Sequence, residues 1–180
     1  MKVLKIAAIV VVLIVLVALG LGKWVVPGVL EGGMNMVKEH EPYVIRPDVQ
    51  AFHDELFIVD LHTDTLLWER DMLVEASVGH VDLPRLQQGN VALQVFSAVT
   101  KSPSGQNYDE NTADSDNITM LAIAQLWPVA TWNSIFERAR YQLAKLKDFV
   151  EASDGYLVFL LSQKDMQALV SKRLSGEKVV

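Results

Sequence analysis

His62 and Asp64 are the two residues whose types and spacing point most directly to chemistry. They follow the apolar run Leu56–Val59, which predicts a buried strand over residues 56–61 because its β-branched pair favours strand over helix. Side chains alternate between the faces of a strand, so residues two apart point the same way. An imidazole and a carboxylate are common ligands of zinc and similar divalent ions. The pair is therefore a candidate metal site at the end of a strand.

A structural interpretation of the same residues stands beside the metal site. His-x-Asp is a short motif, and two ligands do not hold a metal by themselves. His62 could instead be a core histidine oriented by Asp64 or by Asp60. His80 has no partner at ligand spacing, and His53 is expected at the surface of a short helix, so neither joins the predicted metal site.

Composition excludes several classes of function. The 180 residues suffice for one domain with a core of ordinary size. The net charge of −6 argues against a nucleic-acid partner, which requires clustered lysine and arginine. The chain has no cysteine, which excludes disulfides, thiolate metal sites and cysteine nucleophiles. Any metal must therefore be held by His, Asp and Glu.

The N-terminal segment, residues 1–23, is predicted to be a transmembrane anchor. Ile6–Gly22 is an uncharged apolar run between Lys5 and Lys23. The early lysines place the N-terminus in the cytoplasm, so the rest would lie outside as the periplasmic part of a single-pass protein of the cytoplasmic membrane. A cleaved signal peptide is the alternative, because Ala18–Gly20 is a small-x-small sequence. Residues 24–43 are expected to form a membrane-proximal linker.

Beyond the linker, predicted strands and helices alternate along the chain. Further strands are expected at 91–100, at 156–161 and from 178 onward, and helices are expected at about 47–55, 118–127, 131–152 and 163–173. Such alternation predicts an α/β fold with a parallel sheet, and specifically the N-terminal part of a (β/α)8 TIM barrel preceded by a single transmembrane helix. A complete barrel needs about 250 residues, so residues 44–180 are expected to be a portion truncated at the C-terminus.

The longest predicted helix has an apolar stripe at helical spacing, which should face the core. The stripe consists of Ile135, Ala139, Leu143, Leu146 and Val150. By the same spacing Arg138 and Lys145 should stay outside, as should the charged run 69–71.

The chain from about Val44 to Val180 resembles the membrane dipeptidases, the renal dipeptidase-like metallopeptidases, in their bacterial branch. The matching stretches are Val59-Asp60-Leu61-His62-Thr63-Asp64-Thr65-Leu66, the segment Gly79–Ser97, and Asp116-Asn117-Ile118-Thr119 with the helix after it. Each motif is modest by itself, and their order and spacing together carry the resemblance.

The resemblance implies a (β/α)8 barrel that binds two zinc ions and hydrolyses dipeptides, including some with a D-residue on the C-terminal side. His62 and Asp64 would bind one zinc ion. A bridging Glu and the later His ligands would follow Val180, so no catalytic residue is assigned within these residues. The expected partners are a dipeptide, the membrane and a second copy of the chain as a homodimer. Two rival hypotheses are an amidohydrolase-type barrel acting on a lactone or cyclic amide, and a catalytically incomplete, membrane-anchored fragment.

Overall fold

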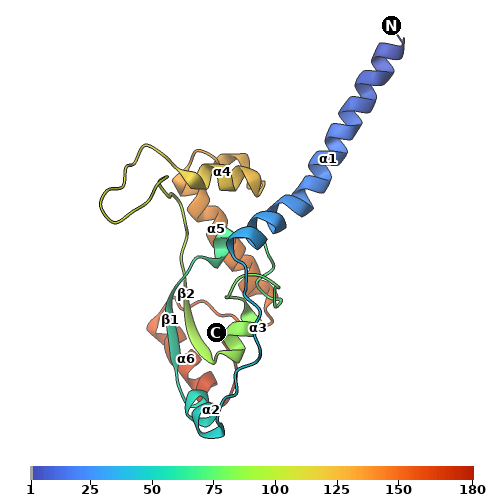
Figure 1. Cartoon of the computed structure of the whole chain (residues 1–180). Coiled ribbons are helices and arrows are strands. Elements are labelled where there is room, and N and C mark those ends of the chain that lie inside the picture. Colours follow the sequence, from blue (N-terminus) through green and yellow to red (C-terminus); the bar gives the residue numbers. More distant parts are fainter. Residues whose placement is uncertain (1) are drawn as a thin grey trace.

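The computed structural model describes the backbone of residues 2–180, and their side chains except at 2–8, 15, 16, 18, 19, 23 and 24. Figure 1 shows the order of the elements along the chain. They are α1 (Lys2–Met34), α2 (Pro47–Asp54), β1 (Ile58–Thr63), the 3-10 turn η1 (Thr65–Leu67), α3 (Leu83–Gln88), β2 (Val91–Phe96), α4 (Asn117–Ala124), the 3-10 turn η2 (Val129–Thr131), α5 (Ile135–Ala152) and α6 (Gln163–Leu174).

The two strands form a parallel sheet, as the alternation of elements predicts. The connection from β1 to β2 runs through η1 and α3. Asp82 caps α3 by accepting a hydrogen bond from the backbone N–H of Arg85. Asn90 then adopts a left-handed conformation with φ 54°, which turns the chain into β2. Local sequence signals are sufficient to explain this strand–helix–strand unit.

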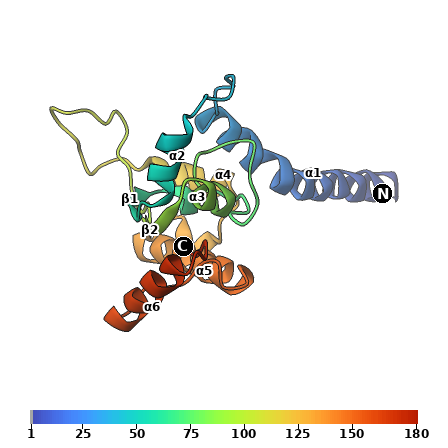
Figure 2. The ribbon, with the colours of Figure 1, turned by 90° about the horizontal axis from the view of Figure 1, so that it is seen from below.

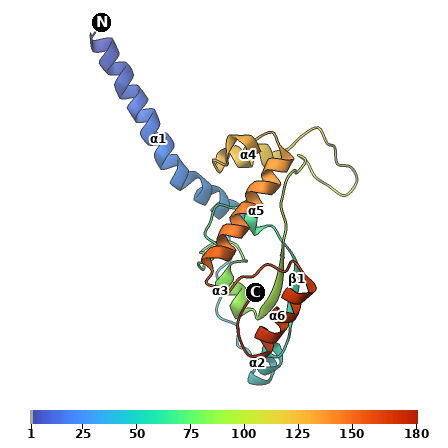
Figure 3. The same cartoon turned by 180° about the vertical axis from the view of Figure 1, so that it is seen from behind.

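Apolar side chains gather in two clusters rather than in one barrel interior. The first cluster joins η1 to α4 through Leu67, Trp68, Ile118, Ala122 and Trp127. The second packs α3 against the C-terminal end of the chain through Met72, Leu83, Leu86, Leu157 and Val180. Figures 1 and 3 show the same division, with α4 and part of α5 above the strands, and α6 beside them.

The predicted TIM-barrel architecture is wrong for this structure, which is a small mixed α/β domain with two parallel strands in its described residues. Residues 156–161 do not form the expected third strand. Their backbone meets Val180 instead: Val180 N donates to Tyr156 O at 2.8 Å, and Val158 N donates to Val180 O at 3.0 Å. These two bonds are a single rung of parallel pairing, too short to be a strand.

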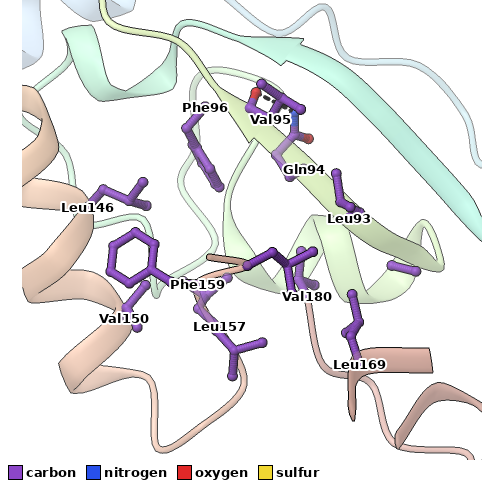
Figure 4. Close-up of a pocket in the computed structure, with 13 residues that line it drawn as sticks. Leu93, Gln94, Val95, Phe96, Leu146, Val150, Leu157, Phe159, Leu169 and Val180 are labelled. Atoms are coloured by element: carbon purple, nitrogen blue, oxygen red, sulfur yellow. Dashed lines mark hydrogen bonds between the residues drawn. The ribbon is translucent and has the colours of Figure 1, made fainter. Parts of the chain in front are cut away.

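An apolar cleft of about 350 Å³ separates this C-terminal segment from β2. Figure 4 shows Leu93–Phe96 of β2 on one side and Leu157, Phe159 and Val180 on the other. Leu169 of α6 also lines the cleft. The two edges are therefore not hydrogen-bonded to each other, which is the physical reason that the sheet ends at β2.

The core-facing side of α5 agrees with the prediction only in part. Leu146 and Val150 of the expected stripe pack against the second cluster, but the most buried residues of the helix are polar. Arg138 and Gln142 are its fully buried residues, with Arg138 only 1% exposed. Leu143, from the predicted apolar stripe, is 59% exposed, and Ile135 is exposed too. The neighbouring loops present backbone carbonyl groups to this side of α5, and a guanidinium group and a carboxamide satisfy those groups where an apolar side chain could not.

The predicted membrane anchor and its localisation are likewise wrong. None of the helices in the described part of the chain is apolar enough over a sufficient length to cross a membrane. A single-pass placement with a periplasmic domain is therefore not supported. The predictions made for Lys5 and Lys23, on either side of the run, concern side chains outside the described residues.

The C-terminal end of α1 is attached to the rest of the fold. Helix α1 continues through part of the expected linker to Met34, and it projects away from the domain in Figures 1 and 2. Near its end Glu31 is only 4% exposed, and its carboxylate lies 2.9 Å from Nε of Arg70. The side chain of Arg70 is 11% exposed and donates to the carbonyl groups of Val78 and Val81. This contact replaces the solvated charge cluster that the sequence predicted around Arg70.

Candidate metal centre

His62 and Asp64 lie at the carboxyl end of β1, where the strand passes into η1. His62 is the fifth residue of β1 (Ile58–Thr63), and Asp64 is the N-cap residue of η1. The pairing of β1 with β2 is irregular between Asp60 and Thr63, so strict alternation does not hold through His62. The two side chains nevertheless converge, because the turn at Asp64 directs its carboxylate back toward the ring.

The two candidate ligands are in direct contact. His62 Nε2 lies 3.2 Å from Asp64 Oδ1, and the side chains are 68% and 48% exposed, respectively. The core-histidine alternative is therefore wrong for His62. The backbone N–H of His62 donates to Asp60 Oδ1 at 3.2 Å, so Asp60 supports the local chain conformation. The His62 ring nitrogen and the Asp64 carboxylate are thus close together and both accessible to solvent.

Ser97 is a third member of the site that the sequence did not single out. Its Oγ lies 3.0 Å from His62 Nδ1, and its backbone N–H donates to Thr63 O at 2.8 Å. The second bond extends the pairing of β2 with β1 one residue beyond Phe96. The parallel register could have revealed Ser97, because carboxyl ends of paired parallel strands meet at one edge of the sheet.

The ligand types of this pair fit zinc, but two ligands are too few for a complete zinc site. An imidazole nitrogen beside a carboxylate oxygen, with the second ring nitrogen already hydrogen-bonded, is the usual arrangement of a histidine zinc ligand. Across the described residues, however, no group of three or more His, Cys, Asp or Glu side chains is placed to hold a metal ion. His62 and Asp64 can therefore supply two ligands to a site that needs others.

The other histidines are placed away from this pair. His53 Nδ1 lies 3.7 Å from the carboxylate of its neighbour Asp54, in α2. His40 Nδ1 contacts the carbonyl of Glu41, and its ring lies against Tyr43. Neither joins His62, as the sequence predicts for His53.

A second polar cluster, which we call the Lys145 cluster, consists of Glu69, Tyr141 and Lys145. Lys145 Nζ donates to Glu69 Oε1 at 3.1 Å and to the carbonyl of Trp68 at 2.8 Å, and Tyr141 donates to the same Oε1 at 3.0 Å. Burial lowers the pKa of Lys145, and the Glu69 carboxylate opposes this shift. Burial also raises the pKa of Tyr141, and Glu69 raises it further. Lys145 was expected outside, and sequence spacing held no sign of this cluster.

No protein-family model, curated protein or solved structure matches the chain.

Proposed function

We propose that this chain supplies a pair of zinc ligands, His62 and Asp64, to a metal-dependent hydrolase that cleaves dipeptides. The observation that supports the proposal is the 3.2 Å approach of His62 Nε2 to Asp64 Oδ1 at the exposed end of β1. The resemblance of residues 59–66 and 79–97 to membrane dipeptidases gives the reaction and the substrate class. The family site has further metal ligands, and the described residues bring no third His, Asp or Glu to this pair.

His62, Asp64 and Asp60 would have different roles at the proposed zinc site. When bound, zinc lowers the pKa of a water molecule and polarises the peptide carbonyl of the substrate. His62 would bind the metal through Nε2, the ring nitrogen that faces Asp64, and Asp64 would add a negatively charged oxygen. Asp60 holds the backbone of His62, which keeps both ligands at the end of the strand.

The loop after β2 lies at the same edge of the sheet and is the candidate substrate-facing segment. It connects β2 to α4, is largely exposed, and forms the long excursion seen in Figure 1. Its two ends are held together, since Ser102 N donates to Asp116 Oδ1 at 3.3 Å and Lys101 Nζ donates to Ala113 O at 2.7 Å. Loops at the carboxyl ends of parallel strands commonly carry substrate contacts.

Zinc titration of the chain, followed by NMR of its histidine side chains, tests the ligand assignment. We expect Zn²⁺ to shift the His62 resonances, with weak affinity because only two ligands are present. The substitutions His62→Gln and Asp64→Asn should each abolish that binding. The matched control is His53→Gln, because His53 also lies beside an aspartate, and it should bind zinc like the unsubstituted chain.

The outcome that would contradict the assignment is equal zinc binding by the His62→Gln and unsubstituted chains. The substrate class is tested separately in the full-length protein loaded with zinc, by assaying dipeptides with L- and D-residues at the C-terminal position. Hydrolysis of lactones or cyclic amides with dipeptides left intact would favour the amidohydrolase-type alternative.

A further inference from the structure

Ser97 is fixed beside the candidate metal centre by its backbone. Its N–H donates to Thr63 O at 2.8 Å, and Thr63 is a buried residue of β1. A substitution of the side chain would leave this backbone bond in place. The hydroxyl group of Ser97 therefore has a role that can be separated from the strand pairing.

The hydroxyl group of Ser97 contacts His62 on the side of the ring opposite Asp64. Ser97 Oγ lies 3.0 Å from Nδ1, and Asp64 Oδ1 lies 3.2 Å from Nε2. Both ring nitrogens consequently have a partner, which defines the orientation of the ring. In a neutral imidazole one nitrogen carries the proton and the other accepts, and the partner of each decides which.

A carboxylate can only accept a hydrogen bond, whereas a hydroxyl can either donate or accept. With Asp64 on Nε2, the neutral ring places its proton on Nε2, and Ser97 donates to Nδ1. With a metal on Nε2, the ring must carry its proton on Nδ1, and Ser97 must accept. The exchange moves one proton from Nε2 to Nδ1 through solvent and leaves the ring neutral in both states.

We propose that Ser97 is a positioning residue that presents His62 Nε2 to the metal and follows the tautomer of the ring by rotating its hydroxyl. The role of Ser97 in the metal-bound state rests on the proposed zinc site. Its role in the metal-free state depends only on the geometry of Ser97, His62 and Asp64. An aspartate or a backbone carbonyl in the position of Ser97 Oγ could only accept a hydrogen bond. It could therefore pair only with the Nδ1–H tautomer of the metal-bound state.

The test measures the ¹⁵N shifts of the His62 ring nitrogens, well above the ordinary pKa of histidine, in the full chain without metal and then with added Zn²⁺. In the unsubstituted chain we expect the Nε2–H tautomer without metal. We expect Ser97→Ala to keep this tautomer, because Asp64 still accepts from Nε2–H. The variant should shift the Nδ1 resonance, because Nδ1 loses its hydroxyl donor. It should also weaken zinc binding about tenfold, as loss of a hydrogen-bond partner of a metal-binding histidine typically does.

Two variants control for effects other than the hydroxyl contact. Ser97→Thr keeps a hydroxyl and should restore both the Nδ1 resonance and the zinc affinity. Ser171→Ala removes a hydroxyl that donates to Gln167 O at 2.9 Å in α6, remote in sequence from the site, and should change neither. A merely structural role of Ser97 would alter stability without altering the Nδ1 resonance or the zinc affinity.

An unchanged Nδ1 resonance in Ser97→Ala would overturn the proposal, as would unchanged zinc affinity in that variant. Failure of the proposed function has a different signature. In that case Zn²⁺ leaves the His62 resonances of the unsubstituted chain unmoved, and the metal-free Nδ1 resonance still decides whether Ser97 contacts the ring.

Discussion

The exposed pair at the end of β1 and the buried side chain of Arg138 use hydrogen bonds in opposite ways. His62 and Asp64 are about half or more exposed, and few protein groups contact them. Arg138 is 1% exposed and donates all around its guanidinium group, to Thr131 O, Thr100 O, Trp132 O, Thr119 Oγ1 and Asp116 Oδ2. A buried polar group with every bond already made holds the structure together, whereas an exposed pair can exchange its contact for a bound ligand.

This difference distinguishes two kinds of polar residue that look alike in the sequence. In the sequence, a histidine near an aspartate can be a surface residue or a site residue. The same is true of an arginine within a helix. Arg138, Gln142 and the Lys145 cluster are buried or hydrogen-bonded within the protein, so we assign them a structural role. His62 and Asp64 are exposed, so a ligand can reach them. Four predictions test this assignment.

Arg138→Met should have the largest effect. It removes the Arg138 donor from five acceptors, one of which is the Asp116 carboxylate, so we expect a loss of about 3–5 kcal/mol in the free energy of unfolding. Urea denaturation measures it. The control is Arg140→Met, because Arg140 is largely exposed and its ion pair with Glu137 should contribute about 0–1 kcal/mol. Equal effects of the two variants would refute the structural role of Arg138.

Gln142→Leu should be the next most destabilising. Gln142 is fully buried, accepts from Val99 N at 3.1 Å and donates to Val99 O at 3.0 Å. Leucine would leave both backbone groups buried without a partner, at a cost of about 1–3 kcal/mol. Denaturation midpoints measure the change. If Gln142→Leu were as stable as the unsubstituted chain, the predicted apolar stripe of α5 would better describe how this helix packs.

Asp116 should make stability depend on pH on the acid side. Burial alone would raise the pKa of Asp116, but hydrogen bonds from Arg138, Ser102, Ile118 and Thr119 outweigh it and hold the pKa below its ordinary value of 3.8. The stabilisation by this carboxylate is therefore fully present above pH 3.8 and is lost as pH falls through the lowered pKa.

The corresponding measurement compares unfolding free energy against pH for the unsubstituted chain and for Asp116→Asn. The asparagine variant should be less stable at neutral pH, and its stability should fall less steeply below pH 4. Parallel curves for the two proteins would mean that Asp116 does not carry this pH dependence.

The combined substitution His62→Gln and Asp64→Asn should have the smallest effect on stability. Both side chains are largely exposed, so the free energy of unfolding should change by no more than about 0.5 kcal/mol. Thermal denaturation checks this in the absence of zinc. A loss comparable to that of Gln142→Leu would place the pair among the structural polar groups and count against a binding role.

Features that depend on residues close together in the sequence agree with the sequence-based expectations. Asp82, Asp116 and Ser162 cap α3, α4 and α6, each by accepting from a backbone N–H two or three residues ahead. The first two strands also occur near their predicted positions. These features depend on a few neighbouring residues, so the sequence contains what is needed to predict them.

Predictions that depended on distant partners were less successful. The segment 156–161 has the composition of a strand, but a strand also requires an adjacent edge, and β2 is separated from it by the apolar cleft. Arg138 and Lys145 were expected outside because their charge suggests solvent, and the acceptors that keep them inside come from other segments. The barrel expected from the sequence likewise requires further strands around β1 and β2, and the described residues do not form them.

By itself, the sequence determined that an imidazole and a carboxylate stand two residues apart at the end of a strand, because that relation is covalent and local. Only the tertiary structure decided that both are accessible, that Ser97 contacts the ring from β2, and that α5 buries an arginine. Each of these depends on which segments meet, and segments meet where apolar surface is buried and every buried polar group finds a partner.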